Sequence, residues 1–209
     1  MTHTHPVGRP VVLELLTGTG LAVAAGLNAY IPLLVLGLAG RFLDVVELPS
    51  AWRWLENEWV LIIIGVLLVI ELVADKIPAV DSINDWLQSI VRPASGGIVF
   101  GTGAATQTAA VTDPAAFFES NAWVPVVAGI VIALVVHAGK MLVRPAANAL
   151  SAGAAAPALS TGEDIGAVLL SIFAILVPIL VIVALVGMVV LVVSIFRRLR
   201  RQRRSVAPA

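Results

Sequence analysis

Long apolar runs separated by short polar segments dominate the chain. The runs 11–38, 59–77 and 123–141 approach or exceed the roughly 20 residues that a helix needs to cross a bilayer. A fourth run, 165–196, would measure about 48 Å as a helix, which is too long for a perpendicular span. We therefore predict four transmembrane helices, the last one tilted and kinked at Pro178.

Two weaker segments, 95–111 and 145–161, consist mostly of Gly, Ala, Ser and Thr. Small residues let helices pack closely in a bundle, but they also suit broken or re-entrant segments that line a cavity. A Val-Arg-Pro-Ala sequence precedes the first segment, at Val91–Ala94, and recurs where the second begins, at Val143–Ala146. Either the two segments are structural repeats, or Arg-Pro simply marks the start of a helix.

Residues 81–91 have a different pattern. Ile83, Trp86, Leu87 and Ile90 share one face at helical spacing, and Asp85 and Gln88 lie opposite. This spacing predicts a short amphipathic helix on the cytoplasmic membrane surface.

Composition supports a membrane protein. The chain is 59% hydrophobic and 12% charged, with a mean hydropathy of +1.01, which is outside the range of soluble domains. The absence of cysteine excludes disulfides and thiolate chemistry. The sequence contains no hydrolase, metalloprotease or phosphate-binding motif. We therefore expect that the protein is not an enzyme and binds no cofactor. We predict one membrane domain, 1–196, and a basic cytoplasmic tail, 197–209.

Charge distribution sets the expected topology. Acids dominate the loops 41–58 and 112–122, whereas arginines fill the tail, at positions 197, 198, 200, 201, 203 and 204. After an apolar run, the positive-inside rule accounts for such arginines better than nucleic-acid binding does, and they should attract anionic lipids. Six crossings with both termini cytoplasmic satisfy every loop: 11–40, 59–77, 94–111, 122–142, 145–161 and 165–196. The prediction is an all-α polytopic bundle in the bacterial inner membrane, and a homo-oligomer is compatible with it.

Charged residues occur where apolar runs end. Glu71 and Asp75 share a helix face, and Lys76 follows at once. A carboxylate at membrane depth pairs with a cation, binds an ion or exchanges protons. Asp75 and Lys76 could equally be interfacial residues, because Lys can extend to the headgroups and Asp can meet water.

A basic stripe matches these acids. His137, Lys140 and Arg144 lie near one helix face. They could face Glu71 and Asp75 across the bundle, with His137 relaying protons. Lys140 and Arg144 could instead be ordinary positive-inside anchors.

Asn28 lies inside the first apolar run, between Gly26 and Pro32. Interrupted helices of this kind expose backbone groups that bind substrate or ions in transporters. The alternative is a buried Asn that joins helices by hydrogen bonds.

Three stretches resemble a known family: Gly26–Pro32, Glu71–Asp81 and Val91–Gly96. They are similar to the hallmark stretches of a bacterial membrane family, domain of unknown function 4126 (DUF4126), over Leu13 to Leu150. This resemblance implies a membrane protein and no particular activity. The stretch Glu71–Lys76 also resembles the metal-binding Glu-x-Gly-Asp-Lys of lysine-exporter-superfamily cation exporters. Here the spacing is one residue longer and Ala74 replaces Gly, so the metal assignment stays open.

Three functions remain. We expect a transporter or channel for a small solute or ion, whose pathway includes Asn28, Glu71, Asp75, Lys76, His137 and Lys140. In a lipid or polyprenyl-phosphate translocase, Arg92 and Arg144 would hold the phosphate headgroup. In a non-transporting subunit of a membrane complex, the charges would form static pairs and small-residue faces would contact partner helices.

Overall fold

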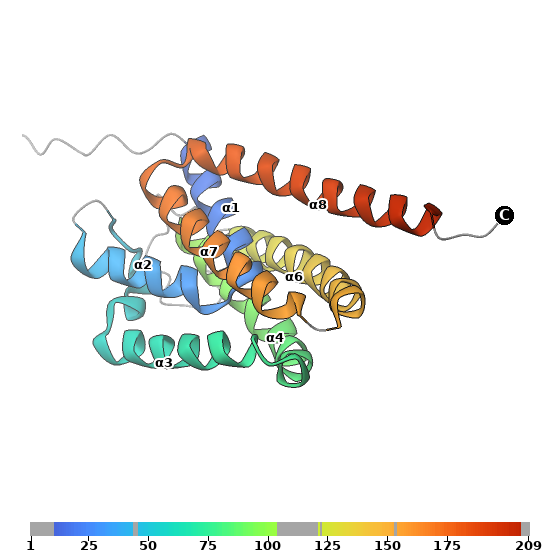
Figure 1. The fold of residues 1–209 in the computed structure, drawn as a ribbon. Coiled ribbons are helices and arrows are strands. Elements are labelled where there is room, and N and C mark those ends of the chain that lie inside the picture. Colours follow the sequence, from blue (N-terminus) through green and yellow to red (C-terminus); the bar gives the residue numbers. More distant parts are fainter. Residues whose placement is uncertain (1–10, 44–45, 104–120, 122, 153, 206–209) are drawn as a thin grey trace, which may run out of the picture.

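The structure is a computed structural model that describes residues 11–43, 46–103, 121, 123–152 and 154–205. All its regular elements within these ranges are helices, which confirms the all-α prediction (Figure 1). They are α1 (Val11–Leu27), α2 (Tyr30–Phe42), η1 (Ser50–Glu56), α3 (Glu58–Ala74), α4 (Pro78–Gly103), α6 (Trp123–Ser151), α7 (Ala155–Leu176) and α8 (Ile179–Ser205).

Helices α1 and α2 form a hairpin, so the predicted single crossing 11–40 is wrong. The chain leaves the helical conformation only at Asn28 and Ala29. The Oδ1 of Asn28 accepts the backbone N–H groups of Tyr30 and Ile31, at 3.0 and 3.1 Å, and thereby caps α2. The middle of α1 lies near the end of α4, because a Cβ on Gly103 would meet Gly18 at 3.1 Å, whereas Gly26 near the end of α1 contacts Arg92 in the middle of α4. The hairpin tip therefore lies at the other end of the bundle.

Helix α4 is continuous across the predicted surface helix 81–91 and the start of the predicted crossing 94–111. Pro93 lies inside it, so Arg92-Pro93 does not mark a helix start. The two faces are as predicted, but the polar face packs against the protein instead of facing the cytoplasm. Asp85 and Gln88 are buried against the protein, whereas Ile83 and Trp86 are each 68% exposed. Residues 104–111 of the predicted crossing lie outside the described residues.

Helices α6 and α7 replace the predicted crossings 122–142 and 145–161. Pro145 lies inside α6, which continues to Ser151 and ends where Ala152 adopts a positive φ of 51°. The Ser151 hydroxyl then accepts the N–H of Ala155 at 2.9 Å and starts α7. A separate crossing at 145–161 is therefore wrong, because this segment contains a turn.

The predicted helix 165–196 is also two helices. The chain breaks at Val177 and Pro178, and α8 then runs back beside α7. Val181 lies next to Gly20, while Met188 packs on the cluster that contains Ala167 and Leu170. Figure 1 shows α8 extending beyond the end where α6 stops and α7 begins. The start of α1 and the end of α8 thus lie at opposite ends of the bundle.

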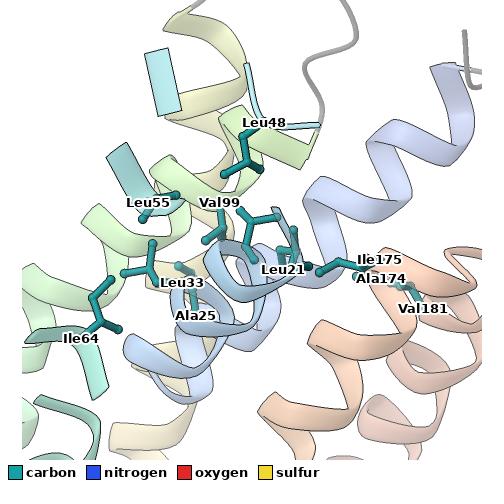
Figure 2. Packing of buried hydrophobic residues seen from close by; sticks show 13 residues of the cluster. Leu21, Ala25, Leu33, Leu48, Leu55, Ile64, Val99, Ala174, Ile175 and Val181 are labelled. Atoms are coloured by element: carbon teal, nitrogen blue, oxygen red, sulfur yellow. The ribbon is translucent and has the colours of Figure 1, made fainter. Parts of the chain in front are cut away.

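Helix α1 packs against α4, α6 and α7 and forms the centre of the bundle. The main apolar cluster joins Leu21 of α1 to Leu33, Val99 and Val181 of three other helices (Figure 2). Glycines bring α4 and α6 into close contact, since a Cβ on Gly129 would collide with the backbone oxygen of Gly96. The small residues of α4 therefore serve internal packing.

Two helices are long and apolar enough to cross a membrane, Trp123–Ala149 of α6 and Ala155–Leu176 of α7. The pair η1 and α3, bent by 65°, would be a third if it forms one span. Helices α1, α2 and the part of α8 at Ile179–Val190 are apolar but shorter. Among the described residues the six predicted crossings are therefore not confirmed.

Candidate functional site

Seven charged side chains gather at the hairpin-tip end of the bundle, and we call them the ionic cluster. They come from the end of α3, the first two thirds of α4, the second half of α6 and the middle of α7. Six of them are buried: Glu71, Asp75, Asp85, Arg92, Lys140 and Arg144. The seventh, Glu163, is partly exposed. Because isolated buried charges are costly, such a cluster persists only when its members pair with one another.

Asp75 lies at the centre of the cluster, just beyond the last residue of α3. Its Oδ2 is 3.3 Å from Lys140 Nζ, 3.3 Å from Arg144 Nη2 and 3.7 Å from Arg92 Nη2. Its Oδ1 accepts a hydrogen bond of 2.7 Å from Asn84. Burial raises the pKa of Asp75, but Lys140, Arg144 and Arg92 outweigh it and hold that pKa below its usual range. Asp75 is therefore an ionised hub whose two oxygens are both occupied.

Glu71 and Arg92 form the deepest pair. Arg92 Nη2 donates to Glu71 Oε1 at 2.8 Å, and the side chains are 1% and 0% exposed. Arg92 Nη1 also donates to the carbonyl of Gly26 at 3.2 Å, in the last turn of α1. This carbonyl lacks an ordinary helical partner because α1 ends at Leu27. The break in the hairpin and the ionic cluster are thus one connected structure.

Glu163 of α7 closes the cluster on the other side. Its Oε2 lies 2.6 Å from Arg144 Nη2 and 3.0 Å from Lys140 Nζ. Asp85 of α4 completes the set, at 3.7 Å from Lys140 and 4.0 Å from Arg144. Lys140 and Arg144 therefore each face acids from three helices or helix ends.

Asn28 links the hairpin tip to α7. Its Nδ2 donates to Asp164 Oδ1 at 3.0 Å, and Lys76 Nζ lies 3.7 Å from Asp164 Oδ2. Lys76, whose side chain is 41% exposed, also donates to the Leu72 carbonyl at 2.9 Å. The pair Lys76–Asp164 borders the ionic cluster on its more exposed side.

His137 of α6 lies beside the cluster, and no carboxylate of the described residues forms an ion pair with it. Its Nε2 is 3.2 Å from the Asp85 carbonyl and 3.1 Å from the Ser89 hydroxyl. Donation to a carbonyl requires the tautomer protonated at Nε2, so Nδ1 would be an acceptor. Nδ1 has no hydrogen-bond partner, and the same holds for Glu71 Oε2, Gln88 Oε1 and Arg92 Nε. Several polar atoms at this site are therefore free to bind a ligand or water.

The structure brings the eight sequence-predicted residues together in or beside the cluster: Asn28, Glu71, Asp75, Lys76, Arg92, His137, Lys140 and Arg144. The sequence analysis missed Asp85, Glu163 and Asp164. Asp85, Gln88 and Arg92 recur at spacings of three and four, which on a continuous helix was a detectable signal. Glu163 and Asp164 showed no comparable spacing, because they are two adjacent acids in an otherwise apolar stretch.

Metal binding and lipid binding find less support than ion pairing. Among the described residues, no group of three or more His, Asp or Glu side chains is arranged to hold a metal ion. The two arginines assigned to a headgroup, Arg92 and Arg144, instead bond to carboxylates. The arrangement can hold, exchange or relay single charges among closely spaced groups.

Comparison with known proteins places the chain in one family. The family model described as "Domain of unknown function (DUF4126)" matches residues 15–198, which extends past Leu150, where the resemblance in the sequence ended. No curated protein and no solved structure matches the chain.

Proposed function

We propose that this chain, which belongs to the DUF4126 family, is a membrane transporter or channel for a small solute or ion. The ionic cluster would form part of its pathway. The observation that carries the proposal is the contact between Arg92, Glu71 and the carbonyl of Gly26. It joins buried charges to the broken end of a helix, the arrangement with which transporters bind ions and small solutes.

The distribution of side chains supports placement in a membrane. On α3, Val69 and Ile70 are 60% and 58% exposed, whereas the neighbouring Glu71 is 1% exposed. Soluble proteins show the opposite pattern, because apolar side chains leave water and carboxylates stay in it. A hydrocarbon environment explains both the exposed apolar faces and the inward-facing charges.

We place the ionic cluster towards the cytoplasm of a bacterial inner membrane. Lys76, Arg92, Lys140 and Arg144 lie at one end of the bundle, and α8 runs towards this end with its arginines. The positive-inside rule assigns such an end to the cytoplasm. Because α1 begins at the opposite end, we expect the C-terminal tail to be cytoplasmic and no longer expect this of both termini.

Ion flux in proteoliposomes tests this proposal. The purified protein is reconstituted with an internal pH-sensitive or Na⁺-sensitive dye, and a membrane potential is imposed. We expect flux of H⁺ or Na⁺ above that of empty liposomes, strongly reduced in Glu71→Gln. Glu58→Gln is the matched control, because Glu58 is an exposed residue at the other end of α3. Absence of flux, or unchanged flux in Glu71→Gln, would argue against the proposed pathway.

A structural subunit is the second candidate, and the ion pairs favour it. Each of Arg92, Lys140 and Arg144 faces at least one carboxylate within 3.0 Å, which suits a static network. Against it, Gly96 and Gly129 pack within the chain rather than offering a face to a partner. Recovery of a stoichiometric partner from native membranes, together with absent flux, would favour this candidate.

A further inference from the structure

Among the described residues, four buried acceptors at or beside the ionic cluster have no donor: Glu71 Oε2, Asp85 Oδ1, Gln88 Oε1 and His137 Nδ1. Glu71 Oε2 and Gln88 Oε1 lack hydrogen-bond partners, and the two residues are only 1% and 3% exposed. Glu71 uses only its other oxygen, for Arg92. Gln88 and Arg92 lie four residues apart on α4 and therefore share a face, and Arg92 contacts Glu71 at 2.8 Å. Both acceptors therefore face the same buried region of the bundle. Buried acceptors of this kind are normally satisfied, so they point to an occupant that donates protons or carries positive charge.

The charge balance points the same way. Among the described side chains, the ionic cluster holds four carboxylates and three cations, because Asp164 pairs with Lys76 outside it. An excess of one negative charge in a buried site is unfavourable until one positive charge neutralises it. An anion would worsen this imbalance, and Arg92 already bonds to Glu71 and Gly26. Arg92 Nε is a buried donor without a partner among the described residues, and it suits the oxygen of a water that accompanies a cation.

Glu71 is the carboxylate that this cation can reach. Asp75 has both oxygens occupied, and Glu163 uses both for Arg144. Asp85 Oδ1 also lacks a hydrogen-bond partner, but the ammonium of Lys140 already lies 3.7 Å from it. The charged and titratable groups that face Glu71 are Arg92 from α4, Lys140 from α6, Tyr30 from α2 and Asp75 beyond the end of α3.

We propose that Glu71 and Gln88 form a binding site for one monovalent cation, either a proton or Na⁺. The ion lies between Glu71 Oε2 and Gln88 Oε1 and completes the neutrality of the ionic cluster. This inference rests on the proposed function only for the role of the ion, which would be the transported or coupling ion. The site itself exists whether or not the protein carries flux.

Binding is therefore measured on detergent-solubilised protein, without transport. Infrared spectroscopy over a pH titration detects a protonated carboxyl group by its C=O stretch, and melting temperature in NaCl against choline chloride at equal ionic strength detects Na⁺. For a proton, we expect a carboxylic-acid band that Glu71→Gln removes and Glu58→Gln keeps. For Na⁺, we expect stabilisation by NaCl alone, which Glu71→Gln abolishes.

A second variant covers the case in which Glu71→Gln does not fold. Gln88→Met keeps the size and charge of the side chain but removes the carbonyl acceptor. The Na⁺ concentration for half-maximal stabilisation should rise roughly tenfold, or the protonation midpoint of the band should shift, because a contact to a charged ligand is lost. No carboxylic-acid band and no Na⁺-specific stabilisation in the wild-type protein, or either signal unchanged in both variants, would overturn the site. Binding without flux would leave the site intact and refute the transport proposal.

Discussion

The carboxylate of Glu71 accepts a hydrogen bond of 2.8 Å from the guanidinium of Arg92, and neither side chain is more than 1% exposed. Arg92 also holds the carbonyl of Gly26 at the end of α1. One buried pair thus connects α3, α4 and the tip of the α1–α2 hairpin. Its removal should affect both the stability of the fold and the charge at the proposed site.

Arg92→Leu should destabilise the protein by about 3–5 kcal/mol, because it leaves the Glu71 carboxylate buried without its main partner. Glu71→Gln should cost less, since the amide oxygen can still accept from Arg92. The double variant Glu71→Gln/Arg92→Leu should be more stable than the sum of the two effects predicts, which identifies direct coupling. Unfolding equilibria of the four proteins in mixed detergent measure this cycle. Strict additivity would contradict the pairing.

Gly129→Ala should weaken the packing of α4 against α6. The added methyl group would collide with the backbone of Gly96, which cannot move aside as a flexible side chain can. We expect a loss of about 1–3 kcal/mol, typical of overpacking. Gly139→Ala, on the same helix, meets nothing within 4 Å and should be neutral or stabilise by up to about 1 kcal/mol. Equal melting temperatures for the two variants would contradict the close contact.

Residue pattern alone predicted the helical class, the faces of residues 81–91 and most members of the ionic cluster. It did so because apolar runs and helical spacing are local properties. It missed the chain reversals at Asn28–Ala29 and Val177–Pro178, which lie inside continuous apolar runs and therefore look like single spans. It also treated Arg92-Pro93 as a helix start, although tertiary contacts keep α4 continuous through Pro93.

Glu163 shows the same difficulty for the site. The predicted six crossings put Glu163 on the external side of the membrane, opposite to the cytoplasmic Arg144. The positive-inside rule assigns loops to a side of the membrane, but it does not detect a turn within an apolar segment. The structure has turns at Ala152 and Ala154, between α6 and α7, and Glu163 lies 2.6 Å from Arg144. The Glu163–Arg144 ion pair depends on the chain reversal between α6 and α7, which the spacing of apolar residues does not show.

Cysteine labelling distinguishes these topologies, since the chain has no native cysteine. Ala154→Cys and Ile77→Cys replace exposed residues near the ionic cluster, and Val177→Cys lies in the turn at the other end. We expect an impermeant maleimide to label the first two from one side of the membrane and the third from the other. With a crossing at 145–161, Ala154→Cys would be inert in the bilayer.

Trp86 should lie in hydrocarbon. It is 68% exposed on the outer face of α4, next to exposed apolar side chains, while Asp85 on the other face is buried. In a variant with Phe at the other four tryptophans, lipids brominated on their acyl chains should quench the fluorescence strongly and acrylamide weakly. Strong quenching by acrylamide would place this face of α4 in water instead.

Water access to the ionic cluster tests the central claim most directly. Ser95 and Ser171 are both buried serines whose hydroxyls donate to carbonyls, of Ala29 at the hairpin tip and of Ala167 in α7. If ions pass through the cluster, Ser95→Cys should react with a hydrophilic methanethiosulfonate reagent in proteoliposomes and lose ion flux. Ser171→Cys should stay unreactive. If both cysteines are inert while Ala154→Cys reacts, the cluster is dry and static, and the transport account is contradicted.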